Sequence, residues 1–183
     1  MSDVLILIAP SGFREEEYAE PKTVLESRGA RVVTASLAAG PCRGNAGTRV
    51  MADVALRDAA PRDWDAVVLV GGPGASVYYD HLDAHQLARR TLQAQGVVAA
   101  ICVAPTILAR AGLLRGVSAT AFASQADALR RFGAVWSSGP VCVSGRIVTA
   151  SGPEVARAFA NEIGDLLRLP KERTASRWPT AAH

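Results

Sequence analysis

Residues 96–112, with the sequence GVVAAICVAPTILARAG, decide the fold of this chain. The apolar run at 96–101 predicts a strand that is buried on both faces. Cys102 closes this run, and the residues from Val103 to Gly112 predict a helix. A thiol at such a sharp strand-to-helix turn has the setting of a nucleophile elbow, where free backbone amides favour a thiolate. A lone cysteine on an apolar strand is equally often an inert packing residue, so its position alone does not decide the matter.

A glycine pair follows a second predicted strand. Residues 66–70 of the predicted strand at 65–70 are apolar, and Gly71 and Gly72 come directly after them. Exposed glycine amides can face an oxyanion or a carboxylate when they lie beside a nucleophile. By themselves the two glycines also fit an ordinary turn.

A cluster of carboxylates follows a third predicted strand, at residues 3–9. The cluster ends at Glu17, and Pro21 lies four residues further on. Such a cluster is usually the solvated start of a helix, where the helix dipole favours negative charge. Pro21 fits the first turn of a helix that runs to Arg28.

The coarse order of elements is that of an α/β protein. We expect the Gly-rich segment 40–47 to be a loop, and we expect strands at 3–9, 31–36, 65–70 and 96–101, a hairpin at 141–149, and helices at 82–95, 125–132 and 154–169. This alternation predicts a doubly wound, mostly parallel sheet of the flavodoxin-like type with a cysteine nucleophile elbow. Sites in such sheets lie at the carboxyl ends of the strands, where Glu17, Gly71, Gly72 and Cys102 would meet.

The composition favours one compact domain in a reducing compartment. The chain has 183 residues, of which 49% are hydrophobic, so it can bury one sizeable core. We expect a single domain over 1–169 and a flexible or oligomer-contacting tail over 170–183. The three cysteines are an odd number and give no disulfide framework, which favours a cytoplasmic protein. Cys42 is expected in an exposed loop, and Cys142 on a strand as a packing residue.

Several classes of partner are disfavoured. The net charge of +3 is modest, and no basic stripe with interleaved aromatic residues suggests nucleic-acid binding. The N-terminal apolar run is too short for a signal peptide or a membrane span. His81 and His85 have the spacing of a pair on one helix face, but no third metal ligand accompanies them. We therefore expect no metal, no other cofactor, no membrane and no nucleic acid.

Taken together, the motifs resemble the ThiJ/PfpI superfamily, which shares the fold of class I glutamine amidotransferases. The matching pieces cover roughly residues 3–168 and fall in the family's order: the Glu-rich stretch spaced from Pro21, Gly71-Gly72, residues 99–106 and residues 149–153. The resemblance implies that Cys102 is the reactive cysteine and Glu17 its acidic partner. It also implies that backbone amides of Gly72, Gly71 and Val103 serve the sulfur or an oxyanion.

The chain departs from this family at three positions. Val103 stands where PfpI-type proteases carry a histidine directly after the cysteine, and Phe122 stands where many relatives place a second histidine. Ala104 replaces a usual glycine but leaves room for the elbow. No Cys/His dyad can therefore be assigned by motif. His81 and His85 could reach Cys102 only if their helix folded over the strand ends.

The resemblance implies a stress-related protein that acts on a small-molecule electrophile. We expect Cys102 to attack small reactive carbonyls in a glyoxalase or deglycase reaction. A second hypothesis is a redox sensor or chaperone-like protein that works through oxidation of Cys102. Peptidase, amidase or isonitrile hydratase chemistry ranks third, because a histidine proton carrier is missing. Relatives commonly form dimers, so we expect a homodimer.

The protonation of the proposed pair can also be predicted. We expect a lowered pKa for Cys102, caused by the helix N-terminus and adjacent amides, with a protonated Glu17 hydrogen-bonded to the sulfur. Because burying two charges together is costly, the pair should share one proton.

Overall fold

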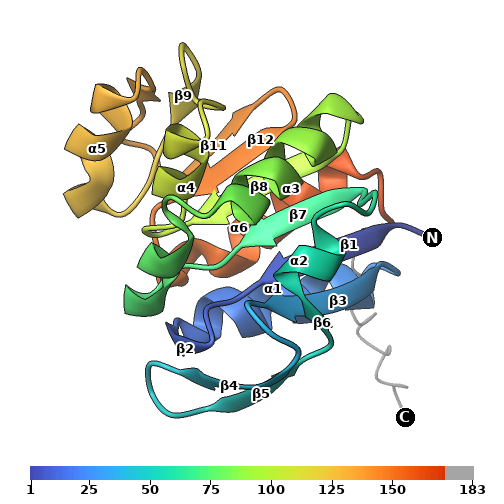
Figure 1. Ribbon diagram of the computed structural model, residues 1–183. Coiled ribbons are helices and arrows are strands. Elements are labelled where there is room, and N and C mark those ends of the chain that lie inside the picture. Colours follow the sequence, from blue (N-terminus) through green and yellow to red (C-terminus); the bar gives the residue numbers. More distant parts are fainter. Residues whose placement is uncertain (172–183) are drawn as a thin grey trace, which may run out of the picture.

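A computed structural model describes residues 1–171 of the chain, which form a seven-stranded central sheet with smaller sheets beside it (Figure 1). The strand order in the central sheet is β11 (Val141–Ser144), β12 (Ile147–Ala150), β8 (Val97–Ile101), β7 (Ala66–Leu69), β1 (Asp3–Leu7), β3 (Arg31–Ser36) and β6 (Val54–Ala55). Every neighbouring pair in it is parallel except β11 with β12.

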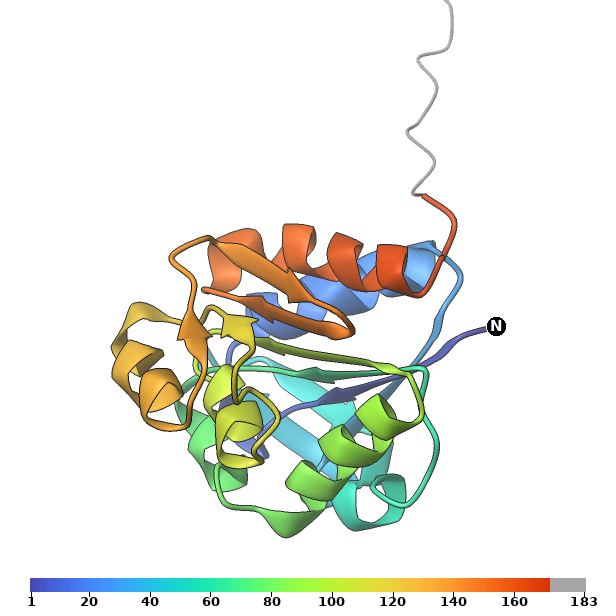
Figure 2. The same cartoon turned by 90° about the horizontal axis from the view of Figure 1, so that it is seen from above.

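Helices cover both faces of this sheet. Seen from above, α1 (Glu15–Ser27) and α6 (Ala156–Leu166) lie on one face, whereas α2 (Leu56–Ala59), α3 (Leu82–Gln93) and α4 (Pro105–Arg110) lie on the other (Figure 2). A sixth helix, α5 (Ala126–Arg131), packs beside α4 (Figure 1). The central strands β7 and β8 are fully buried, which explains their continuous apolar sequences. The predicted doubly wound, mostly parallel α/β fold is confirmed.

The register of the central strands brings the segments that follow four strands to one edge of the sheet. Leu7 at the end of β1 pairs with Leu69 at the end of β7, and Leu69 pairs with Ala100 near the end of β8. On the far side of β8, Ile101 pairs with Ala150. The segments after β1, β7, β8 and β12 therefore emerge side by side at the carboxyl edge.

The Gly-rich segment 40–47 is not the loop that its composition predicts. Most of it forms β4 (Gly40–Gly44), which pairs with β5 (Arg49–Ala52) and with β2 (Ser11–Phe13) in a three-stranded sheet. Cys42 lies in β4 and is 3% exposed, so the expectation of an exposed cysteine is wrong. Backbone pairing with two neighbours fixes this strand, despite residues of low strand propensity.

A small parallel pair lies next to the central sheet. It consists of β9 (Ser118–Ala119) and β10 (Val135–Trp136). Short 3-10 helices, η1 (Pro73–Tyr78), η2 (Ala123–Gln125) and η3 (Pro153–Val155), follow the ends of β7, β9 and β12. Cys142 lies on β11, as expected, and its Sγ is 3.3 Å from the carbonyl oxygen of Ser118.

The first helix begins earlier than Pro21 predicts. Helix α1 starts at Glu15, and Pro21 lies inside it. Proline has no N–H, so it cannot donate to the carbonyl of the residue four positions earlier, which is Glu17. The break in the hydrogen-bond ladder of α1 therefore falls at Glu17.

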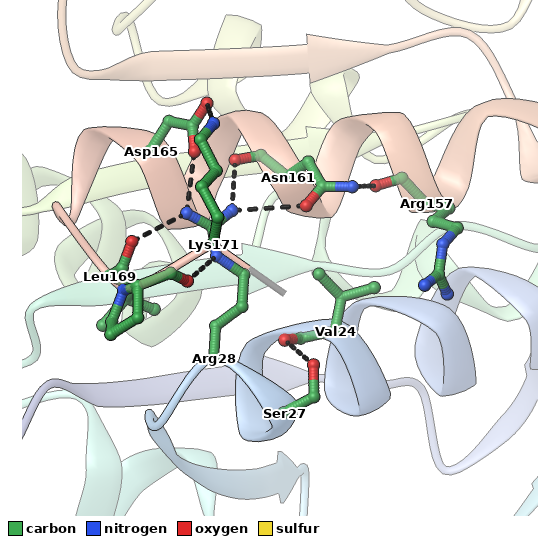
Figure 3. A network of polar contacts seen from close by, with 9 residues as sticks. Val24, Ser27, Arg28, Arg157, Asn161, Asp165, Leu169 and Lys171 are labelled. Carbon is green, nitrogen blue, oxygen red and sulfur yellow. Dashed lines mark hydrogen bonds and ion pairs between the residues drawn. The ribbon is translucent and has the colours of Figure 1, made fainter. Parts of the chain in front are cut away.

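Arg28, at the end of α1, joins this helix to the end of α6 (Figure 3). Its guanidinium is buried and donates to carbonyl oxygens of Asn161 (2.9 Å), Leu169 (3.0 Å) and Pro170 (2.8 Å), and to the carboxylate of Asp165 (2.7 Å). The tail predicted over 170–183 thus begins with an anchored residue, and from residue 172 on it lies outside the described residues. No helix within residues 1–171 is long and apolar enough to cross a membrane.

Candidate active site

Cys102 occupies a strained turn directly after β8. Its φ of 62° lies in the left-handed region, which residues other than glycine seldom adopt. The backbone holds this conformation on both sides: the Cys102 amide donates to Ala150 O (2.9 Å), and the Phe122 amide donates to Cys102 O (2.8 Å). Strain that the surroundings maintain in this way is characteristic of functional turns. The following helix α4 has only six residues, so nearby amides matter more here than a helix dipole.

Glu17 lies in the first turn of α1 and is completely buried. Its Oε2 accepts a hydrogen bond from the Gly71 amide (2.9 Å). Its Oε1 is buried and has no hydrogen-bond partner of normal geometry, whereas the Cys102 thiol interacts with the same carboxyl group. Burial raises the pKa of Glu17 from 4.5 to about 7, and the contacts with Cys102 and Gly71 only partly oppose this rise. A carboxyl group that titrates near neutrality can both release and accept a proton there.

Two glycines allow these groups to approach each other. A Cβ atom on Gly71 would lie 2.5 Å from Glu17 Oε2 and 2.7 Å from Cys102 Cβ. Gly72 has a φ of 97°, and a Cβ there would lie 2.6 Å from the Arg14 amide nitrogen. Side chains at either position would therefore push α1 away from the elbow.

The pKa of Cys102 differs from the sequence-based expectation. Burial raises it, and the ionised Glu17 carboxylate raises it further by repulsion and by accepting the thiol hydrogen bond, to about 12. The amides of Gly72 and Val103 act in the opposite direction by donating to the sulfur. Beside an ionised Glu17 the expected lowered pKa is therefore wrong, because the helix N-terminus cannot offset burial and a neighbouring negative charge. For a thiol beside a protonated Glu17, the lowered pKa stays a prediction.

The environments of the two groups indicate where a single negative charge is better placed. Cys102 is 9% exposed, and its sulfur accepts hydrogen bonds from two amides. Glu17 is 0% exposed, and its carboxyl group accepts from the Gly71 amide alone. A buried charge is stabilised by hydrogen-bond donors and by residual access to solvent. We therefore expect a pair with one proton to hold it on Glu17, which leaves a thiolate at Cys102.

A pocket of about 370 Å³ opens beside this sulfur. Its lining includes Cys102, Val103, Phe122, Arg14, Ser124 and Glu154. Phe122 thus stands beside the cysteine, where the resemblance implied that relatives place a histidine. The lining also contains three polar residues that no sequence motif had indicated, namely Arg14, Ser124 and Glu154. Arg14 could have been found from its position between the end of β2 and Glu17, but nothing in the sequence marks the other two.

The two histidines of the third helix region do not line this pocket. His85 is mostly buried, and its Nε2 lies 2.8 Å from the carbonyl oxygen of Tyr79. The His81 ring packs edge-on against Tyr78. Within residues 1–171, no group of three His, Cys, Asp or Glu side chains is arranged to hold a metal ion. His183 lies outside the described residues.

Residues 2–166 match the DJ-1/PfpI family. A deglycase of Pyrococcus abyssi is 32% identical over 90% of this chain and 99% of its own length. A glutathione-independent glyoxalase of Caenorhabditis elegans is 29% identical over 92% of this chain and 90% of its own length. The crystal structure of a ThiJ/PfpI domain protein from Brachyspira murdochii superposes with a TM-score of 0.87 at 32% identity, covering 91% of this chain and 96% of that one. The strained cysteine turn and its buried carboxyl partner thus lie on a shared framework, and the chain belongs to the DJ-1/PfpI family.

Proposed function

We propose that this protein is an enzyme that converts small 2-oxoaldehydes, or their adducts, into hydroxy acids. The observation that carries the proposal is the contact between the buried carboxyl of Glu17 and the thiol of Cys102 at the wall of a pocket. A nucleophile with an adjacent group that titrates near pH 7 can run addition and proton transfer without a histidine.

The proposed reaction needs no oxidant or reductant. The Cys102 thiolate adds to the aldehyde carbon of methylglyoxal, and the Glu17 proton goes to the oxygen, which gives a hemithioacetal. The Glu17 carboxylate then takes the proton from that carbon, and the resulting enediol is protonated on the neighbouring carbon to give a thioester. Water cleaves the thioester, so methylglyoxal and water yield lactate and the free thiol returns. The Gly72 and Val103 amides are placed to stabilise the sulfur before attack and after release.

The related proteins support the same reaction class. The similar proteins from P. abyssi and C. elegans are named deglycase and glyoxalase, respectively. These names support the proposed chemistry on reactive carbonyls or their adducts.

The test is turnover of methylglyoxal to lactate by the wild type and four single variants. Cys102→Ser should abolish turnover, and Glu17→Gln should lower kcat by roughly 10²- to 10⁴-fold because the proton carrier is lost. Cys42→Ser and Cys142→Ser are matched controls that change thiols outside the pocket, and they should leave turnover within a factor of two or so. Turnover that survives in Cys102→Ser, or its absence from the wild type, would reject the proposal.

A redox role for the same sulfur is the second candidate, and the amide donors around Cys102 favour it. Two molecules of peroxide would convert the thiolate to a sulfinate and release two of water. The donors of Gly72 and Val103 and a protonated Glu17 could then bind the added oxygens. Peptide mass spectrometry after mild peroxide should show oxygen on Cys102 before Cys142, the partly exposed reference thiol. Oxidation of Cys142 first would exclude this role.

A further inference from the structure

Arg14 is the cationic residue among those that line the Cys102 pocket. It is the N-cap residue of α1, and its amide donates to Gly71 O (3.1 Å). The backbone therefore ties it to the same glycine that binds Glu17. Arg14 lines the same pocket as Cys102, and its positive charge lowers the pKa of the Glu17 carboxyl.

The guanidinium of Arg14 is not committed to a structural role. Its Nε lies 3.2 Å from Glu16 Oε2, but that geometry makes no hydrogen bond, and the two side chains are 42% and 58% exposed. Exposed ion pairs of this kind contribute little and exchange readily. Within residues 1–171, Arg14 makes no other ion pair and no side-chain hydrogen bond. Arg28, by contrast, satisfies its donors with buried acceptors.

We propose that Arg14 makes this pocket selective for carbonyl compounds that also carry a carboxylate. A guanidinium with free parallel donors binds a carboxylate bidentately and fixes its orientation. With the carboxylate on Arg14, the carbonyl end of a short substrate would face the sulfur across the pocket. The substrate class rests on the proposed carbonyl chemistry, whereas the anion preference of the pocket does not.

Glu154 is the other charged residue in the lining, and it bears on this selectivity. Its Oε1 accepts a weak hydrogen bond from Ser151 Oγ (3.5 Å), and no basic side chain within residues 1–171 pairs with it. Its negative charge repels an anion at the Glu154 side of the pocket. The carboxylate of a substrate is therefore directed to the Arg14 side, and Glu154 is free to accept from a substrate hydroxyl or ammonium group.

Two alkylating reagents test the anion preference without any need for turnover. Iodoacetate and iodoacetamide form the same C–S bond and release the same iodide, but only iodoacetate carries a carboxylate. The measured quantity is the alkylation rate with iodoacetate divided by the rate with iodoacetamide at Cys102. Peptide mass spectrometry resolves the modified cysteines, and Cys142 is the reference thiol in the same sample. Because both reagents need the same thiolate, this ratio cancels changes in the pKa of Cys102.

We expect the ratio at Cys102 to exceed that at Cys142 and to fall roughly tenfold in Arg14→Gln. Arg14→Lys should retain part of the preference for iodoacetate, because the positive charge stays but the two parallel N–H donors of the guanidinium are lost. The matched control is Arg57→Gln, which removes an exposed positive charge from α2 and should leave the ratio unchanged. Glu154→Gln should raise the ratio at Cys102, because it removes the negative charge that repels iodoacetate.

An unchanged ratio in Arg14→Gln, or an equal fall in Arg57→Gln, would overturn the proposal. The result is separable from the proposed function. A wild type that prefers iodoacetate but does not consume methylglyoxal keeps the anion subsite and rejects the reaction. A wild type that consumes methylglyoxal but shows no preference for iodoacetate keeps the reaction and rejects the anion subsite.

Discussion

Glu17 and Cys102 show how a few neighbouring atoms set the chemistry of the site. The Gly71 amide holds one carboxyl oxygen, and the other oxygen is buried without a partner of normal geometry. The Cys102 thiol interacts with this carboxyl group, and its sulfur accepts hydrogen bonds from the amides of Gly72 and Val103. The sequence predicted these five residues as a group, because each follows a strand end. It could not predict the raised pKa of the sulfur, which depends on burial and on the distance to one carboxylate.

The first prediction concerns stability against pH. Burial raises the pKa of Glu17 from 4.5 to about 7, so between these pH values the folded Glu17–Cys102 pair keeps a proton that the unfolded chain has lost. This contribution is fully present below about pH 4.5 and is lost as the pH rises through 7. Wild type should therefore lose about 3 kcal/mol of unfolding free energy over that range, and Glu17→Gln should not.

Urea denaturation at several pH values measures this difference. Glu16→Gln is the matched control, since Glu16 is the exposed neighbour in the same turn. The same pH slope in the wild type and in Glu17→Gln would show that Glu17 does not hold the proton.

The second residue-scale prediction is that the protein is not an efficient peptidase. Peptide cleavage needs a group that protonates the leaving amine, a role that histidine usually fills. Val103 and Phe122 occupy the two positions where relatives could supply one, and neither His81 nor His85 lines the pocket. Casein should stay intact under conditions in which methylglyoxal is consumed. Robust cleavage that Cys102→Ala abolishes would contradict this.

At the scale of elements, the apolar strands were predictable and the weakly patterned ones were not. Strands β7 and β8 are continuous apolar runs, and helix α3 (82–93) begins and ends within two residues of its prediction. Strand β4 has the sequence GPCRG, which lacks any alternation, and only its pairing with β2 and β5 makes it a strand. Likewise, Pro21 sits inside α1 because tertiary packing overrides the usual position of proline.

The third prediction concerns the link between α1 and α6. Arg28→Ala would remove the Arg28 donors from three main-chain carbonyls and one of the two cationic partners of Asp165, so it should lower the unfolding free energy by about 2–4 kcal/mol. Arg130→Ala, which breaks an exposed ion pair with Asp127, is the control and should cost less than about 1 kcal/mol. Chemical denaturation compares the two, and equal effects would mean that the Arg28 network is not a stabilising contact.

At the scale of the whole molecule, the strand β5 borders an apolar hollow and also carries an exposed apolar side chain. A hollow of about 320 Å³ lies between α1 and β5, lined in part by Phe13, Tyr18 and Val50. Met51 on β5 is 64% exposed. Exposed apolar surface often marks an interface.

The fourth prediction is that the protein is a homodimer with two-fold symmetry. Light scattering at micromolar concentration should give about twice the chain mass of 19.1 kDa. Met51→Glu should shift the mass toward that of one chain if the interface includes the exposed side of β5 that carries Met51. A single-chain mass for the wild type would contradict the dimer.

The most direct test of the shared proton is the pH dependence of thiolate absorbance at Cys102. Wild type is compared with Cys102→Ser as the baseline, both with Cys42 and Cys142 replaced by serine. If the proton stays on Glu17, thiolate should appear with a midpoint near pH 7, where the pair releases its first proton. A midpoint at or above the free-thiol value of about 8.5 would contradict the account, since the sulfur would then titrate beside an ionised Glu17.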